Sequence, residues 1–304
     1  MKYEFIDPDQ ILPTEALRFV ERFLTQTRRL EIGWHYVTDL AWIVAKAMSW
    51  PRSARILDAG GGSGPTQFLL AEIGFDVTNI DLSLPPPSPA YRARYSLTRT
   101  QLDSYVPTEY VDHLRRISGL SSLKQFARNS RAADLLRGGI YTRRHDIWRK
   151  TQPAFASRPL GKLNWIVGNL CSCPEIPSDS YDAVVSLSAL EHIPMEQLPI
   201  AVGEIRRMLK PTARWAVTTS GTEQAHSWFH EPSKGWCFST HDLESIFGTS
   251  KLSNGQAIAT EVLTHYRECE YLQSHIARFY KRSGNNGMPW GKWDPKYVPV
   301  GIYN

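Results

Sequence analysis

The sequence is poor in cysteine and contains no long apolar run. Four cysteines among 304 residues are too few for a disulfide framework, which favours a reducing, cytoplasmic setting. No apolar stretch is long enough to predict a membrane-spanning helix, and the first residues lack the basic and then apolar pattern of a secretory signal. The hydrophobic content of 42% is sufficient for a sizeable core, so we expect one α/β domain with insertions or a small cap.

The cysteines also give little indication of a metal site. Cys171 and Cys173 form the only close pair, and a single intervening residue is not a usual zinc spacing. We therefore expect two thiols in the core or at its rim, and no bound metal.

Charge is unevenly distributed along the chain. The net charge is +5, but residues 84–163 contain 15 Lys and Arg against 5 Asp and Glu. The rest of the chain is slightly acidic, so this segment predicts either an anionic partner or a solvated basic helical surface.

Short apolar segments alternate with helical ones along most of the sequence. Strands are expected at residues 54–58, 75–81, 164–168, 181–187, 214–219 and 260–266, with a last edge strand at 297–303. The first fifty residues are expected to be helical, with helices after residue 13 and over 36–48. Such alternation predicts an α/β fold with a mainly parallel sheet, whose ligands bind at the carboxyl ends of the strands.

This alternation divides the chain into three parts. Residues 1–53 form an N-terminal helical segment, residues 54–83 and 164–304 form the α/β domain, and residues 84–163 form a basic helical insertion. The insertion begins with a proline-rich spacer, and helices are expected at 108–117 and from 122 to the glycine pair at 138–139. We interpret it as a lid for substrate recognition.

A glycine cluster follows the first predicted strand. Gly60, Gly62 and Gly64 stand directly after Asp58, where residues without a Cβ allow a sharp turn and a close approach of ligand to backbone. A dinucleotide fingerprint has its third glycine one position later, where this chain has Pro65. The spacing therefore argues against NAD and FAD.

Polar and apolar residues at three further strand ends complete a nucleoside site. Asp81 can accept both ribose hydroxyls, Asn169 can bond an adenine edge, and Leu187 can line the adenine or methionine portion. The structural alternative is an α/β domain with a vestigial loop.

With these residues, the stretch from Ala54 to Gly221 without the insertion resembles the class I, Rossmann-like S-adenosylmethionine-dependent methyltransferases of the broad small-molecule group. The matching segments are residues 56–64, 79–81, 167–169, 181–193 and 206–211. The resemblance implies a seven-stranded sheet with an antiparallel last strand. It also implies S-adenosylmethionine as the cofactor, with cofactor roles for a set of loop and strand-end residues: Asp58, Gly60, Gly62, Gly64, Asp81, Asn169 and Leu187. The chain departs from this group in its insertion, where relatives usually have a short helix.

Methyl transfer is an in-line displacement, in which a hydroxyl acceptor benefits from a general base. His192 is the first candidate, because the end of the fourth strand of this fold faces the transferable methyl group. The alternative is that Glu191 and His192 only close the strand. His226 and His230 follow the fifth strand and are further candidates.

Two further features bear on the same end of the site. Tyr36, with His35, is expected either to fold over the methionine end of the cofactor or to pack as part of an aromatic cluster. Some ubiquinone-pathway O-methyltransferases present Glu-x-x-Glu-His after the fourth strand, but Ser188 replaces the first carboxylate here. Metal-free transfer is therefore favoured.

Other functions are less well supported. Residues 186–189 lack the Asn/Asp-Pro-Pro-Tyr/Phe pattern of an amino-methylating DNA enzyme. RNA methylation through the basic insertion and a noncatalytic partner protein stay as alternatives. The favoured acceptor of an O-methyl transfer is a small or medium anionic molecule, of the saccharide, nucleotide-sugar or lipid-linked glycan type, with the insertion contacting its anion.

Overall fold

A computed structural model describes residues 1–27, 32–107, 131–250, 252, 255–279 and 293–304. Its centre is an eight-stranded sheet in the order β1-β10-β7-β6-β2-β3-β5-β4. In chain order the strands are β1 (Lys2–Phe5), β2 (Arg55–Ala59), β3 (Asp76–Asp81), β4 (Leu97–Gln101), β5 (Leu163–Val167), β6 (Tyr181–Leu187), β7 (Leu209–Gly221) and β10 (Val298–Tyr303). Adjacent strands from β4 to β7 are parallel, and β10 is antiparallel to both of its neighbours. The predicted α/β fold is confirmed, with eight strands in place of seven.

The N-terminal residues provide the first correction. They were expected to be helical, but β1 pairs with β10, and Lys2 lies opposite Tyr303. The helices expected after it are present as α2 (Glu15–Thr27) and α3 (Tyr36–Ala47), preceded by the short α1 (Pro8–Ile11). β10 was expected at the edge of the sheet, yet it lies between β7 and β1, so β1 forms that edge.

Residues 260–266 are the second correction, because they are helical. They belong to α11 (Gly255–Glu268), and α12 (Glu270–Phe279) follows. The threonines and valine of this stretch favour a strand locally, but its buried residues recur at helical spacing. Those buried residues are Ala259, Val262, Leu263 and Tyr266.

The insertion differs from the all-helical segment expected. It contains α5 (Pro89–Arg94), the edge strand β4, α7 (Arg131–Lys150) and α8 (Pro153–Ala156). The helix expected to end at the glycine pair continues through it. Gly138 lies against α5, where a Cβ would be 3.3 Å from the Cβ of Ala93. The helix expected at 108–117, and the start of the one expected from 122, lie outside the described residues.

A buried carboxylate connects the insertion to the sheet domain. Glu72 of α4 (Pro65–Ile73) is fully buried and forms an ion pair of 2.9 Å with Arg94 and one of 2.8 Å with His145. Arg149 lies 3.6 Å from the same carboxylate. Although burial alone raises the pKa of Glu72, the hydrogen bonds from His145 and Arg94 lower it to about 2.

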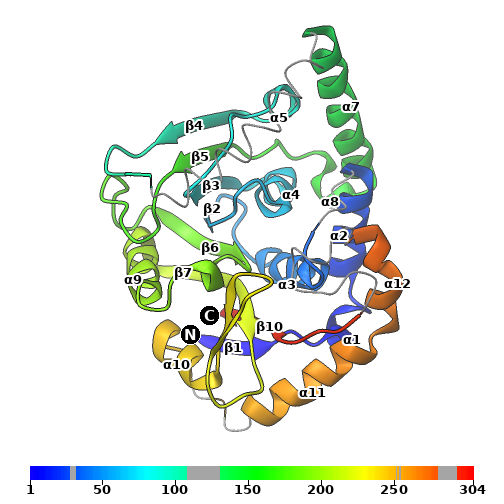
Figure 1. Ribbon diagram of the computed structural model, residues 1–304. Helices are drawn as coiled ribbons and strands as arrows, with labels where there is room; N and C mark the ends of the chain where they lie inside the picture. Colours follow the sequence, from blue (N-terminus) through cyan, green and yellow to red (C-terminus); the bar gives the residue numbers. More distant parts are fainter. Residues whose placement is uncertain (28–31, 108–130, 251, 253–254, 280–292) are drawn as a thin grey trace.

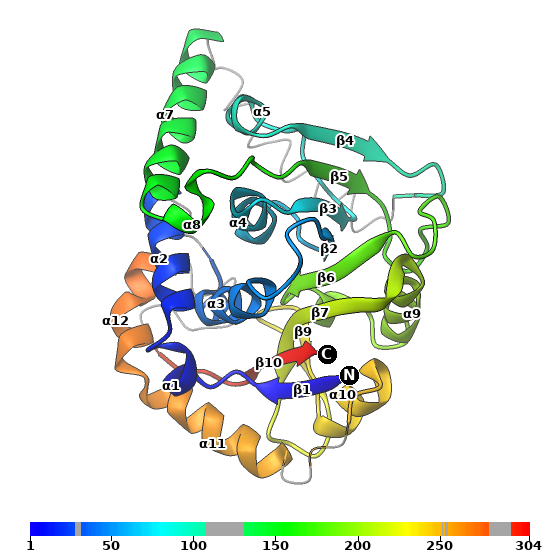
Figure 2. The same cartoon turned by 180° about the vertical axis from the view of Figure 1, so that it is seen from behind.

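Helices cover the sheet on both sides. In Figures 1 and 2, α2, α7 and α8 lie on one side of the molecule, and α9 (Leu198–Met208) and α10 (Thr240–Phe247) lie on the other. The hairpin of β8 (Trp228–His230) and β9 (Gly235–Cys237) follows β7. None of the helices in the described part of the chain has the length and hydropathy needed to cross a membrane.

Candidate functional site

The glycine loop after β2 requires its glycines for two separate reasons. Gly60 and Gly62 have φ angles of +74° and +50°, in the left-handed region that side chains disfavour. Gly61 has no room for a side chain, because a Cβ there would lie 2.2 Å from Oδ2 of Asp58. Gly64 is the residue before α4, and Pro65 begins that helix, as the sequence predicts. Gly60, Gly61, Gly62 and Gly64 are only partly buried, and without Cβ atoms they allow a ligand to approach the backbone closely.

Asp81 lies beside this loop at the end of β3. The amide of Gly62 donates to its Oδ2 at 3.0 Å, and the amide of Ser83 donates to its Oδ1 at 2.9 Å. Asn79 and Gln67 donate to the carbonyl of Gly62 at 2.6 and 2.8 Å, which fixes the loop from beneath. Each oxygen of Asp81 keeps acceptor capacity beyond these bonds, as a ribose diol requires.

Asp58 lies buried under the loop, and neither of its oxygens accepts a hydrogen bond from the described residues. Burial, with a smaller contribution from Asp81, raises the pKa of Asp58 to about 8. A buried carboxylate without partners is costly. A cationic ligand on the loop suits this environment, and S-adenosylmethionine has a sulfonium and an ammonium group. The residues present therefore fit this methyl donor.

The remaining predicted cofactor residues lie at the same edge of the sheet. Asn169 follows β5, and its side-chain oxygen accepts from the amide of Cys171 at 2.9 Å, which leaves its NH₂ group available to a ligand. Leu187 ends β6 with 8% of its surface exposed. Because β5, β3, β2 and β6 are adjacent and parallel, their carboxyl ends bring Asn169, Asp81, the loop and Leu187 to one edge.

A small cavity lies beside this edge. Its volume is about 50 Å³, which suits a reacting group and not a whole acceptor molecule. It is lined by aromatic, imidazole and hydroxyl groups and one carboxylate: Gly33, Trp34, His35, Tyr36, Glu191, His192, Ser220, Ser233 and Tyr297. Tyr36, which was expected to contact the cofactor or to pack in an aromatic cluster, is one of these lining residues.

Glu191 is the buried carboxylate of this cavity. It belongs to the short 3-10 turn η1 (Leu190–His192), and Thr219 and Ser220 of β7 donate to its two oxygens at 3.1 and 3.3 Å. Burial raises the pKa of Glu191, and the nearby imidazoles of His192 and His35 oppose that rise. Burial and the carboxylates Glu191 and Asp39 raise the pKa of Tyr36.

The three histidines proposed from sequence have different surroundings. His192 lines the cavity but is solvent-exposed, and its Nδ1 donates to the carbonyl of Lys234 at 2.8 Å. His230 is buried behind the cavity, where it bonds Ser233 at 2.8 Å and packs on Tyr297, and burial lowers its pKa. His226 is exposed between β7 and β8 and does not line the cavity.

Sequence reasoning missed a buried pair at the start of α3. The Nδ1 of His35 donates to Oδ2 of Asp39 at 2.9 Å, and the hydroxyl of Ser188 donates to the same oxygen at 3.0 Å. Both His35 and Asp39 are buried, with 2% and 0% exposure. The signal available in the sequence was the spacing of four residues at a helix start, which places the two side chains on one face.

The glycine loop and the cavity are neighbours in space. A Cβ on Gly60 would lie 2.8 Å from the Cβ of Ala189, in the turn that leads to Glu191 and His192. Ser188, which begins the turn, has a φ of +44°, and such strained residues often occur at functional sites. A donor bound on the loop is therefore adjacent to the residues that line the cavity.

Most of the basic insertion has no part in this cavity. No described residue of 84–163 lines it. Two of its cations, Arg94 and Arg149, contact Glu72, while Arg115, Arg116 and Arg128 lie outside the described residues. Arg143 and Lys150 line a separate surface groove of about 500 Å³ between α5 and α7.

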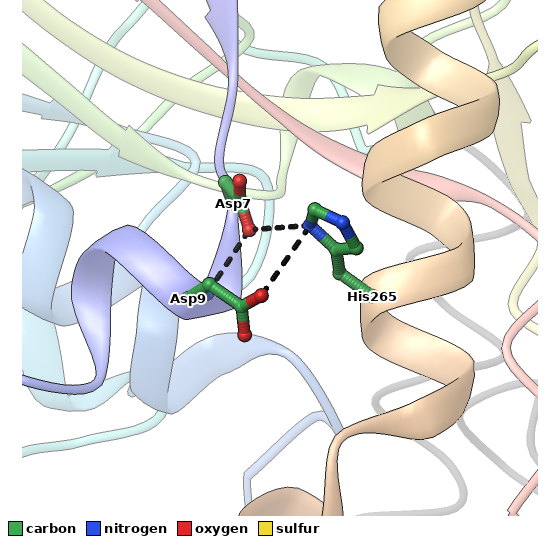
Figure 3. Close-up of side chains that lie close together, drawn as sticks. All are labelled: Asp7, Asp9 and His265. Atoms are coloured by element: carbon green, nitrogen blue, oxygen red, sulfur yellow. Dashed lines mark hydrogen bonds and ion pairs between the residues drawn. The ribbon is translucent and has the colours of Figure 1, made fainter.

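One group of potential metal ligands occurs in the described part of the chain. Asp7, Asp9 and His265 approach one another where α1 meets α11 (Figure 3). His265 Nδ1 lies 3.1 Å from Asp7 and 3.6 Å from Asp9, and Asp7 also caps α1 by accepting from the amide of Asp9. None of the three lines the cavity or belongs to the glycine loop. Ion pairing and capping account for this cluster.

With this geometry in place, comparison with known proteins identifies the family. A model described as "Methyltransferase domain" matches residues 12–254, so the chain belongs to the methyltransferase-domain family. Its mainly parallel sheet, with the glycine loop directly after β2, is the Rossmann-like fold of the class I methyltransferases. No curated protein matches the sequence.

Solved structures with this fold are distant. One is the 1,6-didemethyltoxoflavin-N1-methyltransferase of Burkholderia thailandensis, solved with bound 1,6-didemethyltoxoflavin and S-adenosylhomocysteine. It is 14% identical over 67% of this chain and 64% of that one, with a TM-score of 0.38. A methyltransferase from Methanosarcina mazei is 17% identical over 66% and 79%, with a TM-score of 0.37. The [4+2]-cyclase SpnF is 14% identical over 90% and 82%, with a TM-score of 0.44. This chain thus spans less than two thirds of the Burkholderia enzyme.

Proposed function

We propose that the protein transfers a methyl group from S-adenosylmethionine to a hydroxyl oxygen of a small-molecule acceptor. The donor, when bound, supplies an electrophilic methyl group. In this proposal the loop at Gly60 and Gly62 contacts the donor, Asp81 bonds its ribose, and Asn169 and Leu187 contact its adenine. The domain roles expected from sequence, with residues 54–83 and 164–304 as the catalytic domain, belong to the same proposal.

The observation that supports it best is the contact between Gly60 and Ala189. Through that contact, a loop suited to the donor lies next to a cavity lined by proton-accepting groups. A hydroxyl acceptor must lose a proton during transfer, so imidazole and carboxylate groups are the chemistry that the reaction uses.

The anionic character of the acceptor rests on the charge of the sequence. Residues 84–163 contain a large excess of Lys and Arg. We propose that this basic insertion contacts an anionic part of the acceptor, such as the phosphate or carboxylate of a saccharide or nucleotide-sugar, while the reacting hydroxyl enters the cavity.

Calorimetry with S-adenosylmethionine and S-adenosylhomocysteine tests the donor site. We expect both to bind the wild-type chain, and Asp81→Ala to weaken binding at least tenfold because the ribose loses a charge-assisted bond. Asp103→Ala, at an exposed carboxylate, serves as the matched control and should bind like wild type. Equal affinities for wild type and Asp81→Ala would refute the proposed donor site.

A further inference from the structure

His35 and Asp39 have the arrangement of a base and the group that orients it. The carboxylate of Asp39 accepts from Nδ1 of His35 at 2.9 Å, so the hydrogen of the neutral ring is held on Nδ1. The lone pair then lies on Nε2, the nitrogen that can take a proton. Asp39 is itself held by the hydroxyl of Ser188 at 3.0 Å, at the end of β6.

The surroundings of this pair favour proton abstraction. His35 lines the cavity while being almost fully buried, so its charge interactions are weakly screened. The groups that face it from neighbouring elements are Asp39 and Tyr36 of α3, Glu191 and His192 of η1, and Tyr297 before β10. Two carboxylates close to one imidazole stabilise the imidazolium that forms when it takes a proton.

His192 lacks this support. Its Nδ1 donates to a neutral main-chain carbonyl, and its ring is exposed to solvent. A carbonyl fixes the tautomer, as Asp39 does for His35, but it offers less stabilisation to the positive charge. His192 was predicted from its position after the fourth expected strand, whereas His35, which lines the same cavity, is an imidazole oriented by a carboxylate.

We propose that His35, oriented by Asp39, is the general base of the methyl transfer, a role that rests on the proposed function. The reacting group of the acceptor is then a neutral hydroxyl that loses its proton in the reaction. A lone pair of its oxygen forms the new bond to the methyl carbon, and the carbon–sulfur bond breaks with its electron pair left on sulfur. The hydroxyl proton moves to Nε2 of His35 and from there to water.

The test uses the full chain, S-adenosylmethionine, and a panel of phenols, aliphatic alcohols, phosphorylated or carboxylated saccharides and nucleotide-sugars, with release of S-adenosylhomocysteine as the readout. Calorimetry with S-adenosylhomocysteine comes first and should give unchanged affinity for His35→Gln and Asp39→Asn. A wild-type chain that binds neither form of the cofactor would refute the proposed function itself. Cofactor binding without turnover of any panel member would instead overturn the hydroxyl acceptor and the base assigned to it.

With turnover established, His35→Gln should lower kcat for phenol by about 10²-fold or more with little change in KM, as loss of a general base does. The defect should shrink for 4-nitrophenol, because about half of it is ionised in neutral buffer and the anion needs no base. In His35→Ala, added imidazole should restore part of the rate. These readouts do not follow from a merely structural role.

Two further variants separate the pair from its neighbours. Asp39→Asn should also lower kcat, because its amide NH₂ can donate to Nδ1 and move the ring hydrogen to Nε2. His192→Gln should reduce the rate less than tenfold, and His241→Gln, at a histidine with 85% of its side chain exposed, should have wild-type activity. The assignment would be overturned if His35→Gln kept the wild-type kcat toward phenol or if imidazole did not rescue His35→Ala. It would also be overturned if His192→Gln lost more of its kcat than His35→Gln. If His35→Gln does not fold, wild-type turnover by Asp39→Asn overturns it equally.

Discussion

Gly60 lies against Ala189 so closely that a Cβ on the glycine would be 2.8 Å from the Cβ of the alanine. Gly60 also has a φ of +74°. The residue therefore meets two demands, a left-handed backbone and contact with the turn that leads to the cavity. Neither demand is compatible with a side chain.

Gly60→Val should consequently impair both stability and donor binding. We expect a loss of about 1–3 kcal/mol in the free energy of unfolding from backbone strain, and at least a tenfold loss of affinity for S-adenosylmethionine. Urea denaturation and calorimetry measure the two effects. Gly139→Ala is the control, because a Cβ there meets no atom within 4 Å and the residue is helical. Unchanged affinity in Gly60→Val would show that the donor does not use this loop.

Asp58 should make the free protein less stable as the pH rises. Burial raises its pKa to about 8, above the ordinary value of 3.8. The folded chain therefore holds this proton where the unfolded chain releases it, and stability falls between about pH 4 and pH 8. Asp58→Asn should flatten that part of the stability curve, measured by denaturation at successive pH values. If the stability curve of Asp58→Asn were identical to that of wild type, a group other than Asp58 would cause the pH dependence.

The buried carboxylate under the insertion should be important for stability. Glu72→Gln leaves Arg94, His145 and Arg149 without their shared anion, and removal of one partner of a buried pair costs about 3–5 kcal/mol. Denaturant unfolding measures the loss. Glu231→Gln, at an exposed carboxylate paired with Lys234, should change stability by less than about 1 kcal/mol. Similar effects for the two variants would contradict the network as an anchor of the insertion.

The ion pair between His265 and Asp7 should weaken at high pH. The hydrogen bond and charge of Asp7, with Asp9, raise the pKa of His265. A raised pKa in the folded state means that the stabilisation is complete below the unfolded value and is lost as the pH rises through the folded one. NMR titration of the ring should show this raised pKa in wild type and a fall toward the ordinary value in Asp7→Asn. If the pKa of His265 did not fall in Asp7→Asn, a group other than Asp7 would be raising it.

Local patterns were sufficient to predict the centre of the fold. The parallel strands, the glycine turn and Asp81 each follow from short segments with a clear period or turn chemistry. β1 could not be predicted in this way, because a strand of four residues has weak local signals and its partner lies at the other end of the chain. Residues 260–266 were misassigned since β-branched side chains outweighed a helical burial pattern.

The site was predictable to the same extent. Asp58, Asp81 and Asn169 follow strands, so the topology of a parallel sheet places them together. The pair of His35 and Asp39 depends instead on how α3 packs against β6, where Ser188 contacts Asp39 across 149 positions in sequence. A contact of that range leaves no local pattern. The burial of Glu72 and its ion pairs could likewise not be predicted, because a single acidic residue in a helix usually faces solvent.

The order of the strands determines when, during synthesis of the chain, each strand can pair with its neighbours. β10 lies between β7 and β1, so the first strand of the chain has no neighbour in the sheet until residues 298–303 have been synthesised. Until then, the edge of β7 is unpaired and β1 is detached, while the glycine turn and the strands around it are already available to form. We therefore expect β1 and β10 to join the sheet late, after almost the whole domain has been translated. Until then, the unpaired edge of β7 is the part of the sheet most exposed to wrong pairing in a nascent or truncated chain.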